Sequence, residues 1–191
     1  MLISFIVPWL HEYPICAHSI LAQTDDNWEI IHLHDGPLSD KEKIYNDSIP
    51  KDDRIKSIIL QDGPHNDWGH FARNEGIKYL GKESTAVVFT NGDSYYLPSF
   101  VSDMSRPFHS IKTMATYCNF LQHYNDNAVL DSKLIYGHID CGNFMIRTGI
   151  AKAMGWKYRY EQADWGFIND VILQHGKERM IKINKNLYVH N

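Results

Sequence analysis

Two hydrophobic runs dominate the pattern of the chain, one at its start and one near its middle. Residues 2–7 are mostly apolar, and residues 86–89 are entirely apolar and lead into Asn91-Gly92-Asp93. Such runs predict strands that are buried on both sides, as in a parallel sheet covered by helices. Open α/β sheets bind ligands beyond the carboxyl ends of their strands. The pattern therefore places Asn91-Gly92-Asp93 at a ligand edge, although this triplet is also common in ordinary turns.

Hydrophobic spacing and turn residues predict the other elements. Pro14 suits the first turn of a helix that runs to about residue 22, and a strand follows at 28–34. This strand-helix-strand unit has the length of a right-handed parallel crossover. No element is predicted in the polar stretch 39–53. The remaining elements are a strand at 54–60, a helix at 71–80 capped by Gly81, a helix start at 97–101, strands at 113–121 and 143–147, a helix from 148 to 155 capped by Thr148, a helix at 164–174 stopped by Gly176, and extended segments at 180–183 and 187–189.

Composition narrows the class of protein. The 191 residues, 43% of them hydrophobic, suffice for one domain with a substantial core. The formal net charge of −4 does not favour nucleic acid or an anionic membrane as a partner. A bound phosphate would therefore need local cations, a metal ion or helix ends.

The start of the chain and its cysteines bear on cellular location. Residues 2–7 follow no basic leader, so they predict a first strand rather than a signal peptide, and no window approaches the length of a membrane span. Three widely spaced cysteines, Cys16, Cys118 and Cys141, favour a reduced, cytoplasmic setting over a disulfide scaffold.

A series of short motifs, in order along nearly the whole chain, resembles the family 2 glycosyltransferases of the GT-A fold. The resemblance implies an α/β fold with a mostly parallel central sheet, helices on both faces and a small mixed C-terminal acceptor part. Residues 1–191 would form one domain, with a nucleotide-sugar-binding half at 1–97 and an acceptor-side half at 98–191. The motifs are Ser4-Phe5-Ile6-Val7-Pro8, Ser19-Ile20-Leu21-Ala22-Gln23-Thr24 with Trp28-Glu29-Ile30-Ile31, Asp35-Gly36, Ala72-Arg73-Asn74-Glu75-Gly76-Ile77, Asn91-Gly92-Asp93 before Tyr96-Leu97-Pro98, Asn143-Phe144-Met145-Ile146-Arg147 and Ala163-Asp164-Trp165.

The resemblance implies that the ends of the first strands hold the nucleotide of a UDP-sugar donor. A carboxylate such as Asp35 can accept hydrogen bonds from ribose hydroxyls or a base, and Arg73 can donate to phosphate or carbonyl oxygens. Asp35 as a turn residue before Gly36, and Arg73 as a solvated helix charge, remain alternatives. The nucleotide-binding residues implied are Pro8, Trp9, Leu10, Glu12, Asp35, Arg73, Asn91 and Gly92.

The resemblance also implies a divalent metal ion, Mn²⁺ or Mg²⁺. Asp93 occupies the place of the family's metal-binding aspartate, and His190 lies where related enzymes often carry a metal-binding histidine. Asn91 replaces the first acid of the motif, so it would offer a carbonyl oxygen or bind the ribose. One carboxylate suffices for Mg²⁺ when substrate phosphates join it, and an imidazole ligand favours Mn²⁺. The alternative for His190 is a frayed terminal residue.

Asp164 is the candidate general base, because it matches the aspartate of the family's Glu-Asp motif. Ala163 replaces the glutamate, Glu161 is the reserve carboxylate, and the alternative for Asp164 is a helix-terminal residue stabilised by the helix dipole. The acceptor side would also include Asp140, Cys141, Gly142 and Trp165.

The resemblance, with these residues in its site positions, predicts an inverting glycosyltransferase that moves a sugar from UDP to a hydroxyl of a saccharide or another acceptor. A catalytically weak sugar-nucleotide or glycan-binding domain and a slow UDP-sugar hydrolase remain alternatives, because Asn91 and Ala163 replace family acids. A metal hydrolase built on His32 and His34 is disfavoured, because the chain is too short for the barrel that such pairs usually open. A pyrophosphorylase is disfavoured because no glycine-rich loop follows the first strand.

Overall fold

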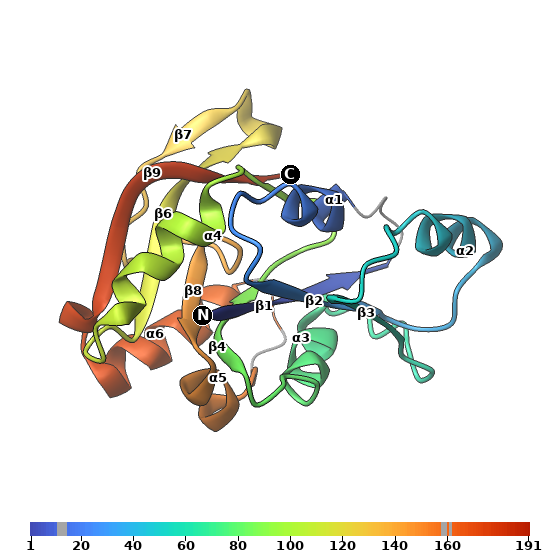
Figure 1. Cartoon of the computed structure of the whole chain (residues 1–191), viewed down its shortest axis with the longest axis horizontal. Helices are drawn as coiled ribbons and strands as arrows, with labels where there is room; N and C mark the ends of the chain where they lie inside the picture. Colours follow the sequence, from blue (N-terminus) through green and yellow to red (C-terminus); the bar gives the residue numbers. More distant parts are fainter. Residues whose placement is uncertain (11–14, 158–159, 161) are drawn as a thin grey trace.

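One sheet runs through the whole protein, with helices packed on both of its faces (Figure 1). The computed structural model describes residues 1–10, 15–157, 160 and 162–191. The strand order is β3-β2-β1-β4-β8-β6-β9-β5, and β7 pairs with β6. The strands are β1 (Leu2–Trp9), β2 (Trp28–His34), β3 (Ile55–Ile59), β4 (Ser84–Phe89), β5 (Tyr95–Tyr96), β6 (Ala115–Gln122), β7 (Ala128–Leu130), β8 (Phe144–Arg147) and β9 (Met180–His190). The α-helices are α1 (Ile15–Leu21), α2 (Asp40–Asp47), α3 (His70–Ile77), α4 (Phe100–Ser105), α5 (Thr148–Met154) and α6 (Ala163–His175).

The N-terminal half contains the parallel part of the sheet. β1 lies between β2 and β4 and is parallel to both, and β3 extends the sheet parallel to β2. The apolar runs at 2–7 and 86–89 form β1 and β4, and their hydrophobic side chains are buried except for the half-buried Leu2. The predicted strands that are covered on both sides are therefore confirmed.

The C-terminal half continues the same sheet with mixed pairing. β8 is antiparallel to β4 and β6, and the long β9 runs parallel to β6. The extended segments predicted at 180–183 and 187–189 are two ends of β9, whose register shifts near Asn119 of β6. The two-residue strand β5, which the pattern did not predict, pairs antiparallel with the end of β9.

Two hydrophobic clusters cover the two faces of the sheet. One contains side chains of α1 and α4, including Ile20 and Phe100, and the other contains side chains of α3, α5 and α6, including Ile77 and Phe167. Figure 1 places α1 and α3 on opposite sides of the parallel strands. The predicted α/β class, with helices on both faces and a mixed C-terminal part, is confirmed.

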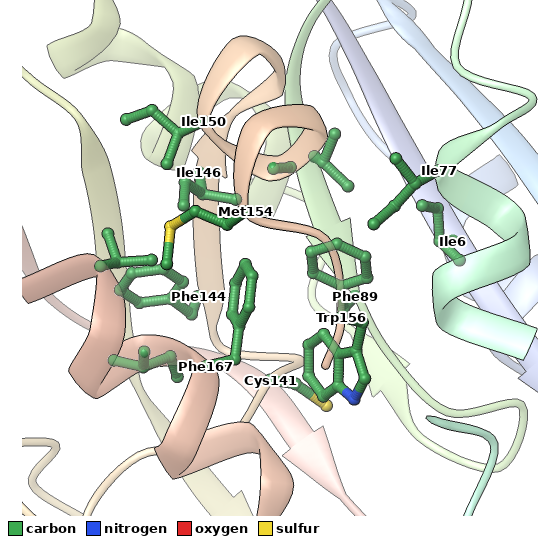
Figure 2. Close-up of a cluster of buried hydrophobic side chains, with 14 of the residues drawn as sticks. Ile6, Ile77, Phe89, Cys141, Phe144, Ile146, Ile150, Met154, Trp156 and Phe167 are labelled. Carbon is green, nitrogen blue, oxygen red and sulfur yellow. The ribbon is translucent and has the colours of Figure 1, made fainter. Parts of the chain in front are cut away.

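Three aromatic side chains of the second cluster join the two halves of the sequence (Figure 2). Phe89 at the end of β4 lies 4.9 Å from Trp156 and 5.3 Å from Phe167 of α6, between ring centroids. Trp156 and Phe167 stack at 4.9 Å. These contacts hold the start of α6 close to the carboxyl end of β4, where a ligand edge was predicted.

The helix α2 lies in the polar stretch for which the pattern predicted no element. Its signal is a capping box, in which the Glu42 amide donates to Ser39 Oγ at 3.4 Å and the Ser39 amide donates to Glu42 Oε2 at 2.7 Å. A sequence of Ser39 followed three residues later by Glu42 could have indicated this helix, whereas its weak hydrophobic periodicity could not.

Two predicted helix ends were wrong. The helix α3 ends at Ile77 and has Lys78 as its C-cap, so Gly81 lies beyond it. In α5 the N-cap is Arg147, and the Thr148 hydroxyl instead bonds to the Ser84 hydroxyl at 2.8 Å. Pro14, predicted in the first turn of the first helix, lies outside the described residues.

In the part of the chain that the structure describes, no helix combines the length and hydrophobicity that crossing a membrane requires.

The close packing of α3 on β1 gives a stability prediction. A Cβ added at Gly76 would lie 2.5 Å from Ile6 Cγ2 and 3.1 Å from Leu33 Cδ1, and both side chains are buried. We expect Gly76→Ala to lower the free energy of unfolding by about 1–3 kcal/mol, because the crowded core must shift. Gly149→Ala in α5 is the control, since nothing lies within 4 Å of its added Cβ. Urea titration should show unchanged or higher stability for the control, and equal stability of both variants would contradict this packing.

Candidate functional site

A cleft lies at the carboxyl ends of β1, β2 and β4, where open sheets bind ligands. It contains most of the residues for which nucleotide contacts were predicted, together with a loop that precedes α3. Arg73 does not line this cleft, and Glu12 lies outside the described residues. The lining residues are Pro8, Trp9, Leu10, Asp35, Asn66, Asp67, Trp68, Gly69, Asn91, Gly92 and Asp93.

Asp35 is a buried carboxylate held by His65. Its Oδ2 accepts from the His65 amide at 2.9 Å, and its Oδ1 lies 2.6 Å from His65 Nδ1. The His65 ring stacks on Phe71 with 3.7 Å between centroids. Asp35 also begins the turn at Gly36, whose φ of +116° suits glycine. Asp35 is therefore both a turn residue and part of the cleft. The contact of His65 with Asp35 was not predicted, because the two residues lie 30 positions apart in sequence.

Trp68 lines this cleft and was also missed by sequence reasoning, as were its neighbours Asn66, Asp67 and Gly69. Its side chain lines the cleft although 64% of it is exposed. Its backbone has a φ of +56°, an uncommon value for a bulky residue, and Asn66 has a φ of +53°. Gly69 follows, with a φ of +77° and with Pro8 so close that an added Cβ would lie 2.8 Å from it. This unusual backbone places a large aromatic ring at the wall of the cleft.

Arg73 lies behind the cleft and is only 2% exposed, which excludes the alternative of a solvated helix charge. Its Nη1 donates to the Trp68 carbonyl at 2.7 Å and its Nη2 donates to the Thr90 carbonyl at 3.1 Å. Nη2 also donates to Asn91 Oδ1. The guanidinium thus ties together two loops of the cleft, the one before α3 and the one after β4.

His70 connects Arg73 to the second half of the chain. Its Nε2 lies 3.0 Å from the Tyr160 carbonyl, which can only accept, so this nitrogen carries the proton. Its Nδ1 then accepts from Trp156 Nε1 at 3.1 Å and faces Arg73 Nη1 at 3.2 Å. The Arg73 guanidinium also lies 5.3 Å from the centre of the Trp156 ring.

A second cleft contains the predicted base and its neighbours. Asp140, Asp164, Trp165 and His190 line it, whereas Cys141 and Gly142 do not. No side chain fits at Gly142, because an added Cβ would lie 2.4 Å from the Tyr188 ring. The complete lining is Phe120, Gln122, Tyr124, Tyr136, Gly137, Ile139, Asp140, Gln162, Asp164, Trp165 and His190.

The pKa of Asp164 in this cleft depends on the neighbouring carboxyl group of Asp140. Burial, and then the negative charge of Asp140, raise the pKa of Asp164 to about 6, although the Trp165 amide and the charge of Arg73 oppose this shift. Asp140 is 7% exposed, and its Oδ1 accepts from the Gly142 amide at 2.7 Å. A carboxylate whose pKa lies near neutral pH can take a proton from a hydroxyl group more readily than an ordinary aspartate.

His190 belongs to the last strand and is not a frayed end. It pairs with Gln122 of β6, and its Nδ1 lies 3.7 Å from Asp140 Oδ2. Tyr95 and Tyr96 pair antiparallel with Val189 and Tyr188, so the residues just before β5 run alongside the end of β9. Asp93, which lines the first cleft, is therefore brought towards His190, which lines the second.

Few side chains that could bind a metal ion lie where Asp93 and His190 approach each other. Among residues 1–10, 15–157, 160 and 162–191, no group of three or more His, Cys, Asp or Glu side chains is placed to hold a metal ion. The oxygen of Asn91 accepts from Arg73, whose positive charge disfavours a cation on the same oxygen. Asp93 and His190 remain as the two candidate metal ligands. Two protein ligands suit an ion that takes its other oxygens from substrate phosphates and water.

The two histidines of β2 do not form an exposed metal pair. His32 is fully buried and stacks on Trp9, and burial lowers its pKa to about 3. The His34 ring nitrogens lie 2.7 Å from the Gly36 carbonyl and 2.8 Å from the Leu10 carbonyl. Both rings therefore support the floor of the first cleft, in agreement with the interpretation of His32 as a core or surface residue.

The family model for glycosyl transferase family 2 matches residues 4–172, and the chain belongs to this family. Over 128 residues it is 29% identical to the uncharacterized glycosyltransferase EpsJ of Bacillus subtilis, an alignment that covers 65% of this chain and 36% of EpsJ. The chain thus spans little more than a third of that relative.

Similar folds occur in glycosyltransferase structures with low sequence identity. TarS 1–349 of S. aureus in complex with UDP-GlcNAc has a TM-score of 0.76 at 17% identity, covering 100% of this chain and 58% of that one. Mannosyltransferase PcManGT of Pyrobaculum calidifontis with GDP-Man and Mn²⁺ has a TM-score of 0.73 at 14% identity, covering 98% and 56%. Glucosyl-3-phosphoglycerate synthase of Mycobacterium tuberculosis with Mn²⁺, UDP and glucosyl-3-phosphoglycerate has a TM-score of 0.67 at 14% identity, covering 100% and 72%. These likenesses show a GT-A fold.

The contacts of Arg73 generate a prediction for the first cleft. In Arg73→Lys a single ammonium group cannot reach the Trp68 and Thr90 carbonyls and Asn91 together, so buried acceptors lose their donors. We expect the free energy of unfolding to fall by at least about 2 kcal/mol and UDP affinity to weaken, because both loops loosen. Urea titration and calorimetry with UDP measure the two effects.

Lys78→Gln is the matched control, since Lys78 follows the same helix and its side chain is 64% exposed. A surface substitution of this kind usually changes stability by less than about 0.5 kcal/mol. Parental UDP affinity and stability in Arg73→Lys would contradict the assignment of Arg73 as the link between the two loops.

Proposed function

We propose that this chain forms the donor- and acceptor-binding domain of an inverting glycosyltransferase, which moves a sugar from a UDP-sugar to an acceptor hydroxyl. One observation carries the proposal. A cleft at the carboxyl ends of the parallel strands is joined, through the β5–β9 pairing, to a second cleft that contains a carboxylate whose pKa is about 6. Membership of glycosyl transferase family 2 supports it.

The first cleft would bind the nucleotide. Pro8, Trp9 and Leu10 line one part of it, and the exposed ring of Trp68 offers a surface for base stacking. Asp35 keeps acceptor capacity for ribose hydroxyls or a base amide, since each carboxylate oxygen has more than one acceptor site. Arg73 would act by positioning Asn91 and Trp68, without touching the phosphates itself. The UDP-GlcNAc bound by TarS supports a UDP-sugar as donor.

Asp93 and His190 would hold a divalent metal ion together with the oxygens of the diphosphate. The nitrogen donor favours Mn²⁺ over Mg²⁺. Such an ion would stabilise the negative charge that develops on the departing diphosphate. Asn91 is assigned to the loop rather than to the metal, because its oxygen already accepts from Arg73.

Asp164 would be the general base. It lies at the start of α6, which the contacts of Phe167 with Phe89 and Trp156 hold near the end of β4. The acceptor hydroxyl loses its proton to the Asp164 carboxylate as its oxygen attacks the anomeric carbon, and the bond to the diphosphate breaks. A single displacement inverts this carbon and needs only one protein carboxylate as base. Asp140 and Trp165 would form the acceptor side.

Donor binding and acceptor binding are assigned to different halves of the chain. Residues 1–97 would hold the donor and residues 98–191 the acceptor, except that His190 reaches back to the metal. The three buried, free cysteines accord with a cytoplasmic setting. A weak binding domain or a slow UDP-sugar hydrolase are the competing functions, since position 163 carries an alanine that is fully buried.

Metal-dependent donor binding is the first test. Asp93→Ala removes the only carboxylate among the two assigned metal donors, so we expect Mn²⁺ to lose its effect on UDP affinity. Calorimetric titration of UDP with and without Mn²⁺ measures this effect. Asp47→Ala, at an exposed position of α2, serves as the control. The metal assignment fails if Asp93→Ala binds UDP with the parental dependence on Mn²⁺.

Turnover is the second test, and it separates an enzyme from a binding domain. Asp164→Asn keeps the shape of the side chain but cannot accept the proton, so transfer should fall at least about a hundredfold. UDP and Mn²⁺ affinity should stay near parental values. In the parent, transfer should rise with pH through about 6, because the base must be ionised. Transfer by Asp164→Asn at the parental rate would mean that Asp164 only stabilises the start of α6. The base would then be Asp140 or Glu161, the latter lying outside the described residues.

The same variant has a stability signature that needs no substrate. The pKa of Asp164 rises from 3.8 to about 6 on folding, so its ionisation destabilises the folded state progressively as pH rises from about 4 to 6. Asparagine carries no charge at any pH. We therefore expect Asp164→Asn to be more stable than the parent at pH 8, by no more than about 3 kcal/mol, and equally stable near pH 4. A difference that does not depend on pH would contradict the raised pKa.

A further inference from the structure

Two exposed tyrosines line the second cleft and have no place in the hydrophobic core. Tyr124 follows β6 and Tyr136 lies between β7 and β8, and each is 62% exposed. Both line the cleft that contains Asp164. Large aromatic side chains that gather at one cleft, away from the core, commonly mark a binding surface.

The two rings differ in how they are held. The Tyr124 hydroxyl accepts from Gln122 Nε2 at 2.8 Å, and its ring meets His190 edge to face at 5.4 Å. Tyr136 makes no side-chain hydrogen bond and no ring contact with any other residue that the structure describes. Tyr124 is thus a fixed wall of the cleft, whereas the Tyr136 ring is available to a ligand. Gly137, with a φ of +75°, makes the turn that follows it.

The chemistry of the lining matches a sugar ring. A pyranose has a face of C–H groups, which an aromatic ring can cover, and a rim of hydroxyls that need hydrogen-bond partners. Tyr124, Tyr136 and the partly buried Trp165 supply aromatic surface, and Gln122 and Gln162 supply amides. Asp140 and Asp164 supply acceptors for hydroxyl hydrogens.

Charge narrows the class of acceptor further. The two carboxylates face the cleft. His190 is the one basic side chain among the described lining residues, and the metal ion assigned to it above would have its charge balanced by Asp93 and the donor diphosphate. A phosphate or carboxylate on the acceptor would meet these like charges in a partly buried site, where repulsion is stronger than in water. The cleft therefore suits a ligand without negative charge.

We propose that the acceptor is an uncharged saccharide whose terminal ring packs on Tyr136, an inference that rests on the function proposed above. Tyr124 would form the second wall around the sugar, and the reacting hydroxyl would lie at Asp164. Tyr136 is a specificity residue in this arrangement, because it contacts the sugar and not the reacting atoms. Acceptors that carry a phosphate, such as a sugar phosphate, are excluded by the carboxylates.

The test compares acceptors and variants with the full chain. UDP, Mg²⁺ and either methyl β-glucoside, methyl β-N-acetylglucosaminide or glucose 6-phosphate are mixed with the protein, and saturation-transfer NMR detects bound sugar. We expect saturation of the ring protons of a methyl glycoside and none for glucose 6-phosphate. With UDP-GlcNAc or UDP-glucose as donor, Tyr136→Ala should raise the acceptor KM about tenfold or more, because an aromatic contact surface is lost, whereas Tyr136→Phe should stay within about twofold of the parent. Tyr79→Ala, an exposed tyrosine outside the cleft, is the control.

UDP titration of each variant separates the two levels of the proposal. Parental UDP affinity in Tyr136→Ala, together with a weakened acceptor, supports the inference. Parental UDP affinity together with an unchanged acceptor KM, or with equal binding of glucose 6-phosphate, overturns the inference and leaves the proposed function standing. Absence of UDP binding by the parent protein overturns both.

Discussion

The buried guanidinium of Arg73 is the interaction on which the arrangement of the clefts depends. Burying a charge is costly unless it is hydrogen-bonded. Here two backbone carbonyls and Asn91 accept from the two terminal nitrogens, while Nε has no partner among the described residues. The acceptors come from the loop before α3 and the loop after β4, so the charge fixes their separation. Through His70 and the Trp156 ring, the same group is also linked to the segment that leads into α6.

The carboxyl groups of Asp140 and Asp164 are a second interaction on which the site depends, and this one destabilises the folded state. Burial, and then the like charge of Asp140, raise the pKa of Asp164, at a cost to the stability of the folded chain. Such a cost is typical of functional sites, where residues are placed for chemistry rather than for stability. The aromatic contacts of Phe89, Trp156 and Phe167 offset it by anchoring α6 in the core.

Much of the fold and part of the site could be predicted from local sequence. The apolar runs of β1 and β4 predict strands buried on both faces. Asp35 directly follows β2, and Asp93 lies four residues beyond the end of β4, so chain order implied their place at the sheet edge. The order of motifs indicated the family that the family model confirms. The helix α2 was missed although Ser39 and Glu42 carry its capping signal, because its apolar pattern is weak.

Side-chain periodicity and chain order were enough to predict most of the strands, the main helices and the residue types at the ends of the parallel strands, but not the short strands β5 and β7. The contacts that those residues make depend on the tertiary structure. Arg73 is a buried link rather than a surface charge, His65 holds Asp35, and Tyr136 shares a cleft with Asp164, since each case depends on pairings between segments far apart in the chain. Sequence patterns describe neighbours along the chain, whereas sheet register and helix packing determine neighbours in space.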